Sequence, residues 1–277
     1  LVTDARRHEV IVLPVDVNLS DWNCTLEKTE DGTNDMNKKL ALRLGLKIVR
    51  GIRQDDVLRI VKNRGERLYG SVEDLRRRGR VGRSVIMKLA DADAFSSFQR
   101  DRRSALWEAL AQERNSCEHP LFDLISASDD DIPELPLMQP AKQVEMDYRT
   151  AGLSLKGHPL MFWREQLDAQ SVVTAIQLPT LDNNCYVRVA GIVLLRQRPS
   201  TAKGITFVTL EDETGTINLV LKQYIWQRYY SVGRRSNAWL VHGKLERKGL
   251  VIHVVAHRLE DLSATLGKYN PKPRDFR

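Results

Sequence analysis

The stretch from residue 186 to residue 259 constrains the fold more than any other part of the chain. It contains five runs that we interpret as strands and one helical run, KQYIWQRYY, between the third and the fourth. The sequences ETG at 213–215 and RKG at 247–249 are typical of hairpin turns. The predicted strands are 186–197, 205–212, 216–221, 238–247 and 250–259. This order of strands and helix predicts an OB-fold barrel, with a small barrel of another type as the alternative.

Two loops of the predicted barrel are basic and polar. They cover residues 196–204, between the first two strands, and residues 246–250, between the last two. In OB folds these loops and the face between them hold single-stranded nucleic acid, through cations on phosphates and rings stacked on bases. The candidate residues are Tyr186, Arg196, Gln197, Arg198, Ser200, Thr201, Lys203, Phe207, Arg247 and Lys248. The alternative is that Phe207 fills the barrel and the loops are only solvated.

A second module, expected at 38–114, has helical apolar spacing. The sequence LKIVRGIRQDDVLRIV predicts a helix-hairpin-helix whose tight turn is Gly51, Ile52 and Arg53, with the second helix starting at Asp55 or Asp56. In such a hairpin the backbone N–H groups face a phosphate. A more degenerate second copy is GRVGRSVIMKL, for which the candidate residues are Arg78, Arg80, Gly82 and Arg83. The alternative for both copies is an ordinary helical hairpin with a solvated basic face.

Charge changes sign along the chain. Residues 43–103 hold 17 Lys/Arg against 8 Asp/Glu, residues 118–147 hold 1 against 8, and residues 183–262 hold 12 against 6. With a net charge of +7, two basic modules joined by an acidic, Pro-containing linker at 115–143 are compatible with a polyanionic partner. The sequence has no apolar run long enough to span a membrane. Three widely separated cysteines favour free thiols in a reducing cytoplasm.

Several sequence blocks, taken in order, resemble the C-terminal part of bacterial C-family DNA polymerases. They are LVTDARRHEVIVLPVDVN, ALRLGLKIVRGI, KLADADAF, DRRSALWEAL, DYRTAGLSLKGHPL and RVAGIVLLRQRPSTAKGITFVTLEDETG. The resemblance runs from Leu1 to about Leu262 and is strongest to the error-prone branch, related to the replicative polymerase III alpha subunit. Because the chain begins at Leu1 and not at Met, we expect a piece of a longer protein.

The resemblance implies the domain order and the partners. Residues 1–37 would be the end of the fingers region, and residues 38–114 would hold duplex DNA at a primer–template. Residues 144–182 would be a short helical connector between the two modules. Residues 183–262 would be the OB fold near the single-stranded template, followed by a basic tail at 263–277. The longer protein would carry out Mg²⁺-dependent translesion synthesis during damage-induced SOS mutagenesis and DNA repair. Its partners would be a Y-family-like adaptor and a RecA-like accessory protein. Leu121 and Phe122 lie where replicative relatives carry a sliding-clamp peptide, but Glu118 replaces the usual Gln.

The sequence therefore predicts a multidomain α+β chain with a helical helix-hairpin-helix module and a five-stranded OB barrel. We expect this segment to bind DNA and to contain neither catalytic nor metal-binding residues. Two other function classes stay open. One is a free-standing nucleic-acid-binding accessory protein, and the other is a protein-docking module built on the OB fold.

Overall fold

The computed structural model describes residues 2–28, 40–111, 135–202, 204–249, 251–263 and 274–276. The chain divides into two units. The first, here called the helical unit, consists of Leu1–Gln139 and Thr150–Leu155. The second, the barrel unit, consists of Pro140–Arg149 and Lys156–Arg277.

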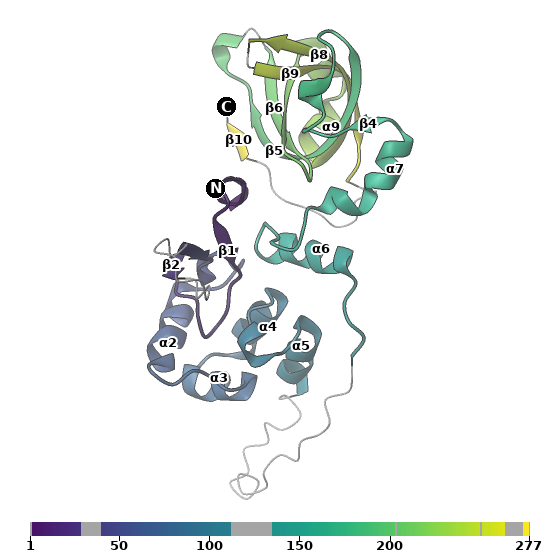
Figure 1. Cartoon of the computed structure of the whole chain (residues 1–277). Helices are drawn as coiled ribbons and strands as arrows, with labels where there is room; N and C mark the ends of the chain where they lie inside the picture. Colours follow the sequence, from purple (N-terminus) through teal and green to yellow (C-terminus); the bar gives the residue numbers. More distant parts are fainter. Residues whose placement is uncertain are drawn as a thin grey trace, which may run out of the picture. The chain divides into compact units, whose positions relative to one another are not determined.

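A three-stranded sheet begins the helical unit (Figure 1). The central strand β3 (Leu40–Arg43) pairs in parallel with β1 (Ile11–Leu13) and antiparallel with β2 (Thr25–Lys28). The helical structure expected across residues 38–114 is therefore wrong for residues 40–43. Such a short apolar run does not distinguish helix from strand by its period, and pairing on both sides decides for the strand. The sheet also crosses the boundary expected at residue 37.

The helices of this unit close around one apolar core. They are α1 (Val2–Arg7), α2 (Gln54–Arg64), α3 (Val72–Gly79), α4 (Arg83–Asp91) and α5 (Arg102–Ala111), with 3₁₀ turns η1 (Leu46–Ile48) and η2 (Ser96–Phe98). On α4 the buried residues recur at the spacing of one helix face, as Val85, Ile86, Leu89 and Ala90. They pack with Leu46, Ile60, Leu75 and Phe95 from the other segments.

The barrel unit begins with α6 (Pro140–Thr150), which starts four residues before the helix expected at 144. Proline suits the first position of a helix because its missing N–H has no partner there in any case. Val144 and Tyr148 of α6 pack with Leu160 and Leu167 of the following segment onto strand residues such as Ile192. The stretch expected only to connect the modules therefore covers part of the outer surface of the barrel.

The barrel strands agree closely with the sequence prediction (Figure 1). They are β5 (Tyr186–Gln197), β6 (Thr206–Glu211), β7 (Thr216–Leu221), β8 (Ala238–Lys248) and β9 (Val251–Asp261). The sheet runs β5-β6-β7-β9-β8 and closes through the β5–β8 pairing. Inward side chains such as Val189, Leu210, Leu219, Val241 and Val254 fill the interior. The prediction of a five-stranded OB barrel in an α+β chain is confirmed.

Short elements complete the barrel unit. The remaining elements are η3 (Pro159–Trp163), α7 (Arg164–Ala169), β4 (Val172–Val173), η4 (Leu178–Thr180), η5 (Ser200–Ala202), α8 (Gln223–Arg228), α9 (Tyr230–Arg235) and β10 (Arg274–Phe276). The single helix expected at 222–230 is thus two short helices, and Trp226 and Tyr229 from this region pack against the barrel core. The backbone of β10 pairs in parallel with residues 195–197 of β5.

None of the helices in the part of the chain that the structure describes has the length and apolar character needed to cross a lipid bilayer.

His158 makes the stability of the barrel unit depend on pH. Burial lowers its pKa to about 4, and nearby Arg164 also lowers it, whereas Asp212 acts in the opposite direction. The unfolded chain binds this proton near the ordinary pKa of about 6.5, so stability is complete above that pH and falls as the pH drops towards 4. We expect the barrel unit to lose about 1–2 kcal/mol between pH 7.5 and pH 5 through this residue.

Urea denaturation at the two pH values measures this loss. His158→Gln should lose less stability on acidification than the wild type, whereas His8→Gln, which changes an exposed histidine, should lose as much. An equal loss in His158→Gln and the wild type would assign the acid sensitivity to other groups.

Candidate nucleic-acid interface

The hairpin between α3 and α4 is the clearest helix-hairpin-helix geometry in the helical unit. Ser71 caps α3, because its hydroxyl accepts a hydrogen bond from the backbone N–H of Asp74 at 3.1 Å. The turn contains Arg80, which ends α3 in the left-handed conformation with φ +50, the buried Val81, and Gly82, the N-cap of α4. The second hairpin copy, whose sequence is the more degenerate of the two, therefore has an α-helix on each side of its turn.

Electrostatics distinguish the N-terminus of α4 from those of α2 and α3. The first turn of α2 carries Asp55 and Asp56, and that of α3 carries Glu73 and Asp74, whereas the first turn of α4 has no acidic residue. Carboxylates at a helix N-terminus already complement its dipole and repel a phosphate. A methyl group added to Gly82 would meet no heavy atom within 4 Å, so the backbone there is open to an approaching group.

Exposed arginines lie beside this turn. Arg80 is exposed, and the Arg77 side chain is 76% exposed at 3.9 Å from Asp74, too far for a close ion pair. Arg83 is half-buried. Arg77 is not one of the candidate residues chosen from the sequence. Arg76 and Arg77 each have an acidic residue three positions earlier, Glu73 and Asp74, which is the spacing of a helical ion pair. Only the distances separate them, because Arg76 lies 2.9 Å from Glu73 and Arg77 lies 3.9 Å from Asp74.

The turn at Gly51, Ile52 and Arg53 is also present, but its surroundings differ from the prediction. Gly51 has φ +75, which favours glycine, and its carbonyl accepts a hydrogen bond from the Lys88 ammonium at 2.7 Å. Ile52 is half-buried and Arg53 is exposed as the N-cap of α2. The helix expected before the turn is only the three-residue η1. With Asp55 and Asp56 beside it, this turn is the less suitable of the two for a phosphate.

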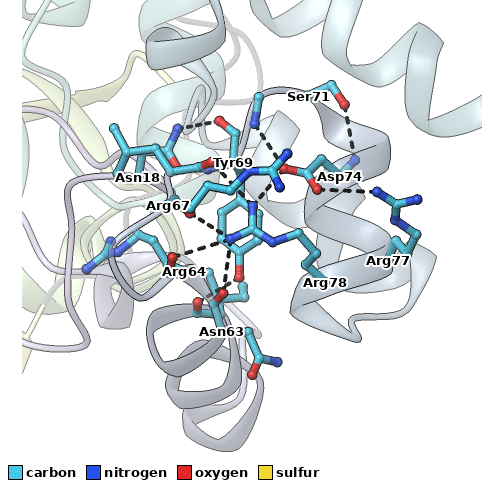
Figure 2. A network of polar contacts seen from close by, with 12 residues as sticks. Asn18, Asn63, Arg64, Arg67, Tyr69, Ser71, Asp74, Arg77 and Arg78 are labelled. Carbon is cyan, nitrogen blue, oxygen red and sulfur yellow. Dashed lines mark hydrogen bonds and ion pairs between the residues drawn. The ribbon is translucent and has the colours of Figure 1, made fainter.

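Arg78 is half-buried, with its side chain 21% exposed, and internal contacts occupy its guanidinium, which argues against its assignment to the DNA-binding surface. Figure 2 shows its guanidinium at the centre of a polar network, over the ring of Tyr69 at 4.8 Å and paired with Asp74 at 2.8 Å. It also donates hydrogen bonds to the backbone carbonyls of Asn63, Arg64, Arg67 and Leu68. These carbonyls belong to the last two residues of α2 and to the segment after it, so Arg78 holds the α2–α3 connection together.

The pKa values of its neighbours agree with a structural role. Burial raises the pKa of Tyr69, whose hydroxyl donates to the Ile60 carbonyl at 2.8 Å. Burial by itself would raise the pKa of Asp74, but hydrogen bonds from the Gly70 backbone and from Arg78 outweigh it and hold that pKa below its ordinary value. Asp74 is therefore a charged partner for Arg78 at neutral pH.

In the barrel unit, Phe207 is 39% exposed on β6, opposite Val220 of β7. The structure thus places it on the outer face and not in the barrel interior. Most candidate residues of the first loop are exposed as predicted, namely Gln197, Arg198, Ser200 and Thr201. Lys203 lies outside the described residues.

Arg196 is the exception in this loop. It is 6% exposed, its guanidinium lies over Trp239 at 5.4 Å, and it donates to the carbonyl of Ser236. A strict period of two would place Arg196 on the outer side of β5, but the register shifts between Val193 and Leu195, and Arg196 pairs with Val208, an inward core residue. Its assignment to the phosphate-binding loop is therefore corrected to a buried structural residue.

The second loop keeps its basic residues at the surface. Lys248 is exposed, and Arg247 is exposed while donating to the carbonyls of Pro179 at 2.6 Å and Leu181 at 3.2 Å. Tyr186, at the start of β5, is 79% exposed. The loop residues predicted from sequence are thus at the surface apart from Arg196 and the undescribed Lys203.

Within the described residues, no group of three or more His, Cys, Asp or Glu side chains is arranged to hold a metal ion. The resemblance implies Mg²⁺ for the longer protein and none for this segment. The predicted clamp peptide at Leu121 and Phe122 lies outside the described residues.

Comparison with known proteins agrees with both domains. The helix-hairpin-helix motif family matches residues 9–105, and the OB-fold nucleic acid binding domain family matches residues 187–262. The fold and these matches define the class: the chain combines two types of nucleic-acid-binding domain. The solved structure of an asparaginyl-tRNA synthetase from Pyrococcus horikoshii aligns with 32% of this chain, over 22% of the synthetase chain. The TM-score is 0.28 and the sequence identity 20%, so this similarity carries no argument about function.

Along its whole length the chain is homologous to error-prone DNA polymerases. It is 46% identical over 279 residues to the one from Rhodopirellula baltica, covering 100% of this chain and 24% of that protein. Error-prone DNA polymerase 1 of Rhizobium meliloti is 41% identical, and the match covers 100% of this chain and 26% of that protein. The error-prone DNA polymerase of Pseudomonas savastanoi is 40% identical, again over 100% of this chain and 26% of that protein. The chain spans about a quarter of the length of these relatives, and its two domains fit the C-terminal part of a C-family polymerase.

Proposed function

We propose that this chain is the DNA-binding region of an error-prone DNA polymerase. The observation that supports this most strongly is the presence of two nucleic-acid-binding domains in one chain whose whole length matches such polymerases. The basic composition of both modules agrees with it.

Within this region, the α3–α4 hairpin would hold the backbone of the primer–template duplex. The N-terminus of α4, free of acidic residues in its first turn, and the exposed arginines beside it would contact phosphates without reading the sequence. The barrel would hold the single-stranded template across the face that carries Phe207, between the loops with Arg198 and Lys248.

For the whole protein we propose Mg²⁺-dependent nucleotidyl transfer during translesion synthesis in SOS mutagenesis and DNA repair, in the bacterial cytoplasm. This rests on the names of the relatives and on the sequence resemblance. A Y-family-like adaptor and a RecA-like accessory protein are proposed as its partners on the resemblance alone.

Replacing Arg77 and Arg80 together by alanine should lower the affinity for a duplex primer–template about tenfold at low salt. It should also reduce the slope of log K against log salt by about one for each arginine that contacts a phosphate. Affinity for a single-stranded oligonucleotide should change little, because the barrel is intact. Fluorescence anisotropy with labelled duplex and single-stranded oligonucleotides over a salt series measures all three quantities.

A matched control removes two other arginines of the same unit, Arg59 and Arg76. Each is about half exposed but paired within its helix, with Asp56 and Glu73 respectively. If the control loses as much duplex affinity as the Arg77/Arg80 variant, the α3–α4 turn is not the contact. If the wild type shows no salt-dependent DNA binding at all, the proposed function fails and a protein-docking role becomes the better explanation.

A further inference from the structure

A cavity of about 560 Å³ opens on the barrel unit beside the start of β5. One of its lining residues, Leu181, accepts a hydrogen bond from Arg247 of the second predicted loop at 3.2 Å. Its apolar lining includes Val173, Leu181 and Val187, and its polar lining includes Tyr186, Arg188 and His257. The volume lies in the range of pockets that bind small ligands, and the combination of apolar residues with a few polar groups is typical of them.

The position of this cavity follows from what covers the outer face of β5 and β8. Farther along β5, the outward residues Ala190 and Ile192 are buried under α6 and the segment after it, together with Leu240 of β8. Towards the start of β5 this cover ends, and the outward residues become Tyr186 and Arg188. The cavity therefore lies where the apolar cover stops and an aromatic, basic surface begins.

Tyr186 presents its ring to the cavity. The side chain is 79% exposed, and its ring centroid lies 5.8 Å from that of His257, with the planes tilted by 52°. A tyrosine ring that stays largely in water retains most of its surface for another planar group. Stacking on a nucleobase is the interaction that such a ring makes in single-strand-binding proteins.

Charge around the cavity suits a polyanion. Arg188 is exposed and donates to the Gln170 carbonyl at 2.9 Å, which holds its stem at the edge of the cavity. Lys244 lies directly across from Tyr186 in the β5–β8 pairing. Glu260 is the acidic neighbour and is shared between His242 at 2.9 Å and Arg258 at 3.1 Å. Arg188 and Lys244 therefore place two basic groups close to Tyr186 on β5 and β8.

The strand register connects this cavity to the face that carries Phe207. Phe207 pairs with Val220, Val220 with Val255, Val255 with Lys244, and Lys244 with Tyr186, which forms one row across five strands. At about 4.8 Å between neighbouring strands, the row is about 19 Å long. Val255 in the middle of this row is buried, so the row gives the register between Tyr186 and Phe207 and not an open path for a strand.

We propose that this cavity binds an unpaired base of single-stranded nucleic acid, which stacks on Tyr186 while Arg188 contacts the adjoining phosphate. The proposal rests on the proposed function of the barrel and adds a specific base site at the start of β5.

The test compares the affinity of the full chain for an oligothymidylate with that for an abasic oligonucleotide of equal length, which keeps the phosphates but lacks bases. Tyr186→Ala should bind the oligothymidylate about tenfold more weakly and the abasic strand as tightly as the wild type does. Tyr186→Phe should retain the wild-type affinity, because the ring is kept. Tyr224→Ala, which removes a tyrosine that is 58% exposed on α8, is the matched control and should behave as the wild type.

Three results would overturn the proposal. If Tyr186→Ala binds oligothymidylate as well as the wild type does, the base site is wrong while single-strand binding by the barrel stands. Equal losses for both oligonucleotides would mean that Tyr186 supports the fold or the phosphate contacts and does not stack. Failure of the wild type to bind either strand would refute the single-strand role itself.

Discussion

Arg78→Ala is expected to lower the free energy of unfolding of the helical unit by about 2–3 kcal/mol, since it leaves several partly buried acceptors without a donor. The Arg78 guanidinium satisfies Asp74 at 2.8 Å and the Arg67 carbonyl at 2.6 Å, and it covers the ring of Tyr69. Removing it also leaves the Asp74 carboxylate, whose side chain is only 13% exposed, without its closest cation. The connection between α2 and α3 should loosen first.

Hydrogen exchange read by mass spectrometry in increasing urea measures this effect peptide by peptide. Peptides from α2 and α3 should lose protection, while peptides from the barrel unit should keep theirs. Arg77→Ala is the matched control, because its side chain is 76% exposed and 3.9 Å from Asp74. It should change stability by less than about 0.5 kcal/mol, as exposed substitutions generally do. Equal effects of the two variants would contradict the structural role of Arg78.

Gly45→Ala is expected to lower the free energy of unfolding of the helical unit by about 3 kcal/mol, at least as much as Arg78→Ala, because there is no space for the added methyl group. A Cβ at this position would lie 2.4 Å from the carbonyl carbon of Asn23 and 2.5 Å from the carbonyl oxygen of Trp22. Both are backbone atoms of a segment that accepts hydrogen bonds from Leu46 and Lys47 just beyond Gly45. Relief therefore requires the two backbone segments to move apart and weaken those bonds.

Gly70→Ala supplies the comparison within the same unit. A Cβ there would meet no heavy atom within 4 Å, so this change should leave the urea midpoint within experimental error of the wild type. The same hydrogen-exchange experiment should report lost protection near β3 and η1 for Gly45→Ala alone. Wild-type stability of Gly45→Ala would show that the two segments are not packed as closely as the structure has them.

The barrel could be predicted from sequence because its local signals agree with each other. The strand β5 occupies residues 186–197, the predicted range, and the ETG turn falls between the paired strands β6 and β7. In the RKG sequence, Arg247 and Lys248 still pair with β9, and the chain turns at Gly249. Inward residues are apolar along each strand, so the pattern of burial is already present in the sequence. The same holds for α4, whose apolar residues recur at helical spacing, and for the Ser71 cap of α3, because serine before a helix caps its N-terminus.

The predictions from sequence are wrong where contacts between distant segments determine the structure. Residues 40–43 form a strand because β1 and β2 flank them, and β1 lies about thirty residues earlier in the chain. Arg78 and Arg196 belong to basic stretches that predict phosphate contacts, yet carbonyl groups from other segments bind both. The sequence shows that an arginine is present, but only the fold determines whether its guanidinium binds groups of the protein itself or stays available to DNA.

The sequence by itself determined the two kinds of domain, the family resemblance and the basic character of both modules, because periodicity, turn residues and net charge are local properties. Tertiary structure decided which arginines stay at the surface, which of the two hairpin turns lies between two α-helices, and where the cover over β5 ends to leave the cavity at Tyr186. These outcomes depend on contacts between residues far apart in the chain, and such contacts form only when the backbone has folded.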